Sequence, residues 1–251
     1  MSLAGRVCII TGGGSGIGRA TALLLAREGV KLALVGRTAS KLEAVRKEVR
    51  AEGGSADIFA LNIADHEAVQ RMAGAVLEAH GRIDVLVNNA GHSSPHRRLL
   101  TTTPEEIRSV IDSNLVGAIY CAQAVVPAML KAGEGTIINV SSMAGLSPGI
   151  IGGMVYSPAK AGLINFTQYL NVELKNTGIR SSVVIPGEVD TPAMDRRPVP
   201  PPSEARATMA TAADAAEAIA MIIRMPQRTN IPELIVKPTM ERDLGAEVDV
   251  P

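Results

Sequence analysis

Short apolar runs alternate with longer amphipathic segments along the chain. Seven of the apolar runs are rich in Val and Ile and are not interrupted by polar residues, which is typical of strands covered on both faces. They predict strands at residues 7–10, 32–35, 58–61, 85–87, 136–140, 182–185 and 234–236. Between them, apolar residues at helical spacing predict helices at 17–28, 40–52, 66–80, 104–130, 155–176 and 212–224.

Two of these helices begin with capping signals. Thr103 is followed by Pro104 and by two glutamates, so that a capping side chain, a proline at the first position and acids in the first turn coincide. Asp65 precedes the helix at 66–80 and is expected to cap it.

The repetition of strand and helix predicts an α/β fold. Parallel strands joined by right-handed crossovers would form a doubly wound, seven-stranded sheet with helices on both faces. We find no linker, so residues 1–251 are expected to form a single domain. The composition breaks once, at 196–203, where four prolines exclude a helix and predict a surface loop near the carboxyl ends of the strands. We assign residues 194–210 to a substrate loop and expect an extended tail at 241–251.

The amino-acid composition argues against several classes of binding partner. Lys and Arg number 25, as do Asp and Glu, so the formal net charge is zero and neither a polyanion nor a membrane surface is indicated. Aromatic residues make up 2% and Trp is absent, which argues against stacking on nucleic-acid bases. No apolar run approaches the ~20 residues of a membrane helix, and no secretion signal is recognisable, so we expect a cytoplasmic protein. Cys8 and Cys121 lie in apolar stretches and are expected to be buried thiols without a disulfide or metal role.

A glycine-rich turn joins the first strand to the first helix. In Thr11–Gly18 (TGGGSGIG), Gly12 would permit the tight turn, Gly16 would let backbone approach a pyrophosphate, and Gly18 would let the helix pack on the strand. The amides around Ser15 and Ile17, at the start of the helix, would face the phosphates. This context predicts a Rossmann-type dinucleotide site, and the alternative is a glycine-rich loop without a ligand.

The end of the second strand indicates which dinucleotide binds. A site selective for NAD usually has an acidic residue here for the ribose hydroxyls, but this chain has Gly36 followed by Arg37 and Thr38. A guanidinium suits a 2′-phosphate, which favours NADP(H). The alternative is that Arg37 is a solvated residue at the start of the next helix.

Tyr156 and Lys160 are four residues apart and share one helix face. A phenol has an unperturbed pKa near ~10, too high for a base at neutral pH. A nearby ammonium would lower that pKa and make the pair a proton donor and acceptor for a carbonyl or alcohol. This spacing also occurs by chance, so it carries weight only with the other motifs.

Those motifs follow the predicted strands in order. They are Asn88–Gly91 (NNAG), Asn114–Gly117 (NLVG) within a helix, Asn139–Gly145 (NVSSMAG) and Pro186–Thr191 (PGEVDT). Together with the glycine turn and the Tyr–Lys pair, the ordered set resembles the short-chain dehydrogenase/reductase family over nearly the whole chain, as an NADP-preferring member.

The resemblance implies four catalytic residues. Tyr156 is similar to the general acid/base, and Lys160 to the residue that lowers its pKa and holds the nicotinamide ribose. Ser142 resembles the serine that hydrogen-bonds the substrate oxygen, and Asn114 the asparagine that supports a water in the proton relay. Ser141 remains the alternative serine.

The resemblance also implies the cofactor contacts. Beyond the glycine turn and Arg37, they are Asn89, Ala90 and Gly91 along the cofactor, and Pro186, Gly187, Val189 and Thr191 at the nicotinamide carboxamide. The hydride chemistry itself belongs to the nicotinamide.

Two features depart from the family. Asn62, followed by Ile63, stands where the family often has an aspartate against the adenine, although an amide oxygen can still accept from the adenine amine. The stretch from Ser142 to Tyr156 looks about one residue longer than usual, with the extra residue in the loop 147–154.

The sequence says less about the substrate. Apolar residues at 143–154, namely Met143, Leu146, Ile150, Ile151 and Met154, could form an adaptable pocket wall or ordinary core. Arg196 and Arg197 could pair with a substrate carboxylate or be a solvated basic pair. His92 and His96 have no clear further ligand nearby, so no metal is expected. The short loop before the last long helix favours an open cleft and a small or medium carbonyl compound.

The leading hypothesis is therefore an NADP(H)-dependent oxidoreductase that transfers hydride to or from a small carbonyl or alcohol. A non-catalytic dinucleotide sensor or scaffold on the same fold, and a lyase or epimerase that uses the nicotinamide transiently, are the alternatives. The resemblance implies a homotetramer or dimer through the helices at 104–130 and 155–176, which carry few charges on several turns.

Overall fold

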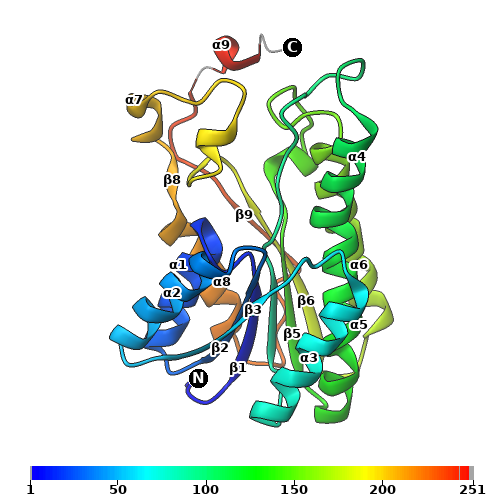
Figure 1. The fold of residues 1–251 in the computed structure, drawn as a ribbon. Coiled ribbons are helices and arrows are strands. Elements are labelled where there is room, and N and C mark those ends of the chain that lie inside the picture. The colour runs from blue at the N-terminus through cyan, green and yellow to red at the C-terminus, as the bar shows by residue number, and fades with distance from the viewer. Residues whose placement is uncertain (1, 243, 249–251) are drawn as a thin grey trace.

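The computed structural model describes residues 2–242 and 244–248. Within them, the seven predicted strands form one parallel sheet in the order β3-β2-β1-β4-β5-β6-β9 (Figure 1). The strands are β1 (Val7–Thr11), β2 (Lys31–Gly36), β3 (Ser55–Ala60), β4 (Val85–Asn88), β5 (Gly135–Val140), β6 (Ile179–Pro186) and β9 (Glu233–Val236). The predicted doubly wound, Rossmann-type sheet is confirmed.

Helices cover both faces of this sheet, as Figure 1 shows. On one face lie α1 (Gly16–Arg27), α2 (Ala39–Ala51) and α8 (Ala212–Arg224), and on the other lie α3 (His66–His80), α5 (Gly117–Ala132) and α6 (Tyr156–Glu173). Every residue of β1, β4, β5 and β6 is buried between the two layers, which explains why these strands read as unbroken apolar runs. Two separate hydrophobic cores result, one on each face.

The predicted helix at 104–130 is continuous but not uniform. It consists of α4 (Pro104–Ile111), a π-helical turn (Asp112–Val116) and α5. The predicted capping box is present, because Thr103 Oγ1 accepts from the Glu106 amide at 3.3 Å and Glu106 accepts from the Thr103 amide at 2.9 Å. A π turn widens the helix locally and often occurs at functional sites.

This helical stretch also corrects the expectation that no segment of the chain approaches the length and apolar character of a membrane helix. The segment Pro104–Ala132 is long and apolar enough to cross a membrane by length and composition alone, with a mean hydropathy of 1.5 over its best window. A search for an unbroken apolar run misses it, because polar residues such as Gln123 and Lys131 interrupt the run without lowering the average far. In the structure α5 packs on α3 and on β4 and β5, so part of this apolar surface is core.

The short elements within the substrate loop and the small second sheet were not predicted from the sequence. The substrate loop 194–210 contains a 3₁₀ turn (Met194–Arg196) and α7 (Ser203–Arg206), and β7 (Val189–Asp190) pairs with β8 (Ala210–Thr211) in a small second sheet. The proline stretch between them is irregular and largely exposed, as predicted.

The prediction of an extended tail at 241–251 is wrong for its described part. Residues Gly245–Val248 form α9, and the chain there lies against the substrate loop. Arg242 pairs with Glu188 and Glu247 pairs with Arg197, and these charge pairs between distant residues hold the segment down. Residues 243 and 249–251 lie outside the described residues.

The two cysteines are buried, as predicted, each with no exposed surface. Burial raises the pKa of the Cys121 thiol to about 12 and that of the Cys8 thiol further, with Asp84 adding to the effect on Cys8. Both side chains are therefore neutral thiols that fill space in the core.

Candidate active site

The order of strands reverses between β1 and β4, and a cleft in a doubly wound sheet is expected at such a point. Here the glycine turn meets Asn89 and Ala90. Thr11 Oγ1 accepts from both of their amides at 3.0 Å, and Asn89 Nδ2 donates to the Thr11 carbonyl at 3.0 Å. These bonds tie together the turns that follow the two strands.

The glycines of the turn are required by close contacts. Gly12 has φ +67°, and a Cβ there would lie 2.8 Å from Asn89 Nδ2. A Cβ at Gly18 would overlap the Gly12 carbonyl. Gly16 has φ +53°, and a Cβ there would lie 3.4 Å from the Thr191 side chain. Because Gly16 has no side chain, its backbone is accessible from the cleft. Ser15 begins α1 without a side-chain capping bond among the described residues, which leaves the first amides of the helix for an anion. The turn fits a dinucleotide pyrophosphate.

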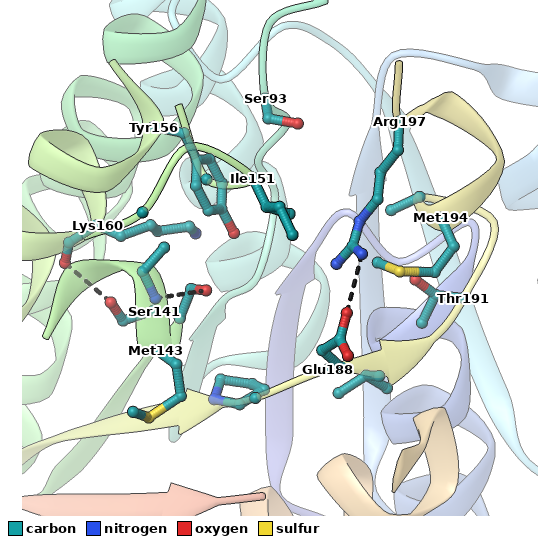
Figure 2. A pocket seen from close by; sticks show the side chains of 18 of the residues that line it. Ser93, Ser141, Met143, Ile151, Tyr156, Lys160, Glu188, Thr191, Met194 and Arg197 are labelled. Atoms are coloured by element: carbon teal, nitrogen blue, oxygen red, sulfur yellow. Dashed lines mark hydrogen bonds and ion pairs between the residues drawn. The ribbon is translucent and has the colours of Figure 1, made fainter. Parts of the chain in front are cut away.

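A cleft of about 500 Å³ opens at this point, at the carboxyl ends of the strands (Figure 2). It is large enough for a small ligand beside a nicotinamide. Among the residues predicted to contact the cofactor, those that line it are Ile17, Asn89, Gly91, Tyr156, Lys160, Pro186, Gly187, Val189 and Thr191.

The residues expected at the adenosine end lie outside this cleft. Arg37 and Thr38 are exposed between β2 and α2, in the position from which a side chain could reach a 2′-phosphate. Arg37 is close enough to lower the pKa of His92, although burial of that histidine is the larger cause. The Asn62 Oδ1 atom accepts from the Ala64 amide at 3.2 Å. The Ile63 side chain is buried against Gly117, so only its backbone could face a ligand.

Tyr156 and Lys160 stand at the start of α6 and point toward the same side of the cleft (Figure 2). Lys160 Nζ lies 5.5 Å from the centre of the Tyr156 ring and donates to the Val140 carbonyl at 2.9 Å. Ser142 caps the 3₁₀ turn Met143–Gly145 after β5, and its hydroxyl hydrogen-bonds the Tyr156 side chain. Ser141 instead donates to the Lys160 carbonyl at 2.8 Å. The geometry thus brings Ser142, rather than Ser141, to the tyrosine hydroxyl.

The π turn positions Asn114. Its Nδ2 donates to the His92 carbonyl at 2.7 Å and to the Val110 carbonyl at 2.8 Å, while its Oδ1 is buried without a partner among the described residues. A Cβ on Gly91 would overlap this Oδ1 and would lie 3.3 Å from Lys160 Nζ. Gly91 therefore marks the small space in which the asparagine and the lysine approach each other, and an orphaned acceptor there suits a water molecule.

The electrostatics of Tyr156 differ from the sequence prediction. Burial raises the pKa of Tyr156, and the Ser142 hydrogen bond together with the charges of Arg97 and Arg197 only partly oppose it. The expected lowering of this pKa by Lys160 is therefore wrong in direction, because desolvation outweighs the nearby cations. Burial also lowers the pKa of Lys160 to about 8.

The apolar wall is only partly where the sequence placed it. Met143 and Ile151 line the cleft, whereas Leu146 and Ile150 do not. Met154 packs against a small core cluster with Val110 and Val155 instead. His92 contacts Ser109 and Ser113, and His96 pairs with Glu106. Within residues 2–242 and 244–248, no three His, Cys, Asp or Glu side chains are grouped as metal ligands.

The substrate loop contributes Arg197, while Arg196 is exposed and does not line the cleft. Arg197 pairs with Glu188 at 2.9 Å, as Figure 2 shows, and with Glu247 at 3.0 Å. The proposed pairing of Arg197 with a substrate must therefore compete with two carboxylates of the protein itself.

Sequence reasoning missed two parts of this cleft. One is Arg97, a buried arginine in the polar loop after Gly91, which no periodicity distinguishes. The other is the wall formed after β9 by residues 237, 238, 240–242 and 244. The rule that ligands bind beyond the carboxyl ends of parallel strands could have indicated this second wall.

Comparison with known proteins gives concordant matches. The family model described as short chain dehydrogenase matches residues 6–199. The 3-oxoacyl-[acyl-carrier-protein] reductase FabG of Thermotoga maritima is 39% identical over 198 residues, which cover 79% of this chain and 80% of the relative. A metagenomic short-chain oxidoreductase solved in complex with NADP is 34% identical, with a TM-score of 0.83 and coverage of 96% of this chain and 100% of that chain. The closed form of a serine dehydrogenase complexed with NADP⁺ is 27% identical, with a TM-score of 0.85 and coverage of 96% and 98%.

Proposed function

Because the chain belongs to the short-chain dehydrogenase/reductase family, we propose that it transfers hydride between NADP(H) and a small or medium carbonyl or alcohol substrate, with Tyr156 as the general acid and base. The observation that carries this proposal is that Ser142, Tyr156 and Lys160 line one cleft, together with Ile17 of the glycine turn, and that Ser142 hydrogen-bonds the Tyr156 side chain. Proton donor, oxygen-binding hydroxyl and cofactor-binding backbone then share one space.

In the direction of reduction, the Tyr156 hydroxyl donates its proton to the carbonyl oxygen of the substrate. Its raised pKa keeps this hydroxyl protonated at neutral pH, which suits a proton donor. The Ser142 hydroxyl would donate a second hydrogen bond to the same oxygen and stabilise the charge that develops on it. When bound, the nicotinamide supplies the hydride to the carbonyl carbon or accepts it from the alcohol.

The resulting phenolate must recover a proton. Lys160 Nζ lies 5.5 Å from the centre of the Tyr156 ring, and its pKa of about 8 allows it to release a proton near neutral pH. The unpaired Asn114 Oδ1 beside Gly91 could hold a water that returns a proton to the lysine. Gly91 has to lack a side chain for these two groups to communicate.

Preference for NADP(H) is proposed from the chain between β2 and α2. Gly36 offers no carboxylate to the ribose hydroxyls, and the exposed Arg37 guanidinium can pair with a 2′-phosphate. The NADP complexes of two relatives support this assignment.

By their names, the FabG relative acts on a 3-oxoacyl group and the second structural relative on serine. A 3-oxoacyl group and serine each have an oxygen on the third carbon of an acyl group or acid. We therefore propose short oxo and hydroxy compounds as the first substrates to test. The cleft volume of about 500 Å³ is consistent with a small or medium molecule.

The test is a titration of the purified protein with NADPH and with NADH, followed by carbonyl compounds monitored at the nicotinamide absorbance. Tight NADPH binding with turnover is the expected result. NADPH binding without turnover on a broad panel would favour a sensor, or a lyase that leaves no net change in absorbance. No binding would contradict the cofactor site.

A homodimer or homotetramer and a cytoplasmic location remain proposals. Tyr169 and Val172 on α6 and Leu130 on α5 are large apolar side chains that are exposed in the single chain, which supports association through these helices. Analytical ultracentrifugation of the purified protein would give the oligomeric state, and a monomer at micromolar concentration would refute this part.

A further inference from the structure

Arg97 is the least expected residue of the cleft. Its side chain is 3% exposed, yet it lines the same cavity as Ser142 and Tyr156. Its Nη1 atom donates to the Ile151 carbonyl at 2.8 Å and to the Gly152 carbonyl at 3.1 Å, while Nε is buried without a partner among the described residues. A guanidinium has five N–H donors and stays charged, so hydrogen bonds to two carbonyl oxygens offset only part of the free-energy cost of burying it.

The loop that receives Arg97 is shaped for it. Gly153 has φ +82°, which a side chain would disfavour, and a Cβ there would lie 2.9 Å from Arg97 Cδ. The Met154 amide donates to the Arg97 carbonyl at 3.1 Å, so backbone and side chain both attach this arginine to the loop 151–154. Arg97 is therefore held in one place at the wall of the cleft.

Apart from Lys160, the other charged side chains that line the cleft balance one another. Arg197 and Arg242 share Glu188 and Glu247, which makes two cations and two carboxylates. At the far wall, Lys237 pairs with Glu241. For Arg97, by contrast, no carboxylate among residues 2–242 and 244–248 lies within ion-pair distance.

Besides the Lys160 ammonium, which serves the proposed proton transfer, this leaves Arg97 as the one unpaired guanidinium among the described residues that line the cleft, near the reacting oxygen. Arg97 and Arg197 both stabilise the charged form of Tyr156, so both lie within electrostatic range of its hydroxyl. A single excess guanidinium matches one negative charge better than the two of a phosphate monoester, and a carboxylate is the anion of that charge and shape.

We propose that Arg97 binds the carboxylate of the substrate, and that the substrate class is therefore small oxo acids and the corresponding hydroxy acids. This inference rests on the proposed function. In the reduction, hydride from NADPH adds to the carbonyl carbon and the Tyr156 proton adds to its oxygen, giving the hydroxy acid and NADP⁺. The carboxylate is unchanged and serves only to orient the molecule. Arg97 is in these terms a specificity-determining residue.

The experiment compares acids with their own methyl esters, which keep the carbonyl and lose the charge. The probes are pyruvate, 3-oxobutanoate and 4-oxopentanoate, each beside its methyl ester, with NADPH as reductant. These three acids place the carboxylate at increasing distances from the carbonyl. Binding of each acid and of its ester to the NADP⁺-saturated protein is measured separately by calorimetry, so that recognition is observed whether or not turnover occurs.

For the wild type, at least one acid should exceed its ester in kcat/KM by about 10–100-fold, the value of a charge-assisted hydrogen bond. Arg97→Gln should raise KM for that acid by about the same factor and change KM for the ester by less than about 3-fold. Arg97→Lys, which keeps the charge, should retain part of the preference. Arg108→Gln removes an equal charge from the exposed face of α4 and should leave both substrates unaffected.

Each outcome is decisive. If no acid is preferred over its ester and none binds the NADP⁺ complex more tightly than its ester, the inference is wrong, whether or not Arg97→Gln folds. If esters are reduced and acids are not, the oxidoreductase proposal survives and the anion site does not. If acids bind through Arg97 but nothing is reduced, the anion site stands and the proposed function fails. Equal loss of acid and ester activity in Arg97→Gln would mean that the arginine only holds the loop.

Discussion

Gly91→Ala is the substitution whose effect follows most directly from the geometry of the site. The new methyl group would overlap Asn114 Oδ1 and would lie 3.3 Å from Lys160 Nζ. Asn114 has no room to retreat, because its residue is fully buried and its Nδ2 is held by two backbone carbonyls. The alanine must therefore displace the asparagine amide or the loop that carries residue 91.

The expected magnitude has two parts. Overpacking of a buried site costs about 1–3 kcal/mol of folding free energy. A displacement of catalytic groups by about 1 Å can lower the rate roughly 100-fold. We therefore expect kcat to fall about 10–100-fold, with the folded protein retained. KM should change less than kcat, because the methyl group would be directed at Asn114 and Lys160.

The assay measures kcat and KM with NADPH, together with urea unfolding of the same samples. Gly74→Ala is the matched control, because Gly74 lies within α3 and a Cβ there would meet nothing within 4 Å. That control should keep wild-type kcat and gain roughly 0.5–1 kcal/mol of stability from helix propensity. A Gly91→Ala enzyme with kcat within twofold of the wild type would refute the proposed route between Asn114 and Lys160.

Two further predictions concern the cofactor and pH. Arg37→Ala should weaken NADPH binding by about 10-fold or more, since a charge-assisted bond to phosphate is lost, and should leave NADH binding nearly unchanged; equal loss for both in fluorescence titrations would contradict the 2′-phosphate assignment. Burial raises the pKa of Tyr156, so its hydroxyl remains protonated below that pKa and reduction should persist from pH 6 to 8, whereas alcohol oxidation, which needs the phenolate, should rise with pH. Loss of the Lys160 charge above its pKa of about 8 should then lower NADP(H) affinity in alkaline buffers, and a pH-independent ratio of oxidation to reduction rates would refute this reasoning.

The layered fold could be predicted because the central strands β1, β4, β5 and β6 are buried on both faces. This burial can be recognised from local sequence, as in the largely apolar runs Val7–Ile10 and Thr136–Val140. The helices between such runs can pack only on one face or the other of the sheet. The motifs after each strand then meet at one edge of the sheet for the same reason. Glycines with positive φ, such as Gly12, mark the turn from sequence because only glycine adopts that conformation without strain.

The remaining features depend on contacts between distant residues. The C-terminal segment is held at the cleft because Glu247 pairs with Arg197 and Arg242 pairs with Glu188. No local sequence pattern predicts either ion pair. The burial of Arg97 depends on the backbone of Gly152 and Gly153, some fifty residues later. For Tyr156, the sequence shows the neighbouring lysine but not the desolvation, which decides the direction of the pKa shift.

The π turn at Asp112–Val116 illustrates an intermediate case. The apolar periodicity of residues 104–130 correctly predicts a helix, but one widened turn shifts the phase too little to be recognised. That turn is what directs Asn114 toward Gly91 and His92. A small departure from regular geometry therefore determines where a candidate catalytic side chain lies.

The central claim is that Tyr156 exchanges the proton with the substrate oxygen, and turnover by Tyr156→Phe tests it most directly. Phenylalanine keeps the ring against its neighbours and removes only the hydroxyl. The variant should bind NADPH with an affinity close to that of the wild type and reduce no carbonyl compound at a measurable rate. Turnover at the wild-type rate with an intact cofactor complex would contradict the assignment of Tyr156 as the general acid and base.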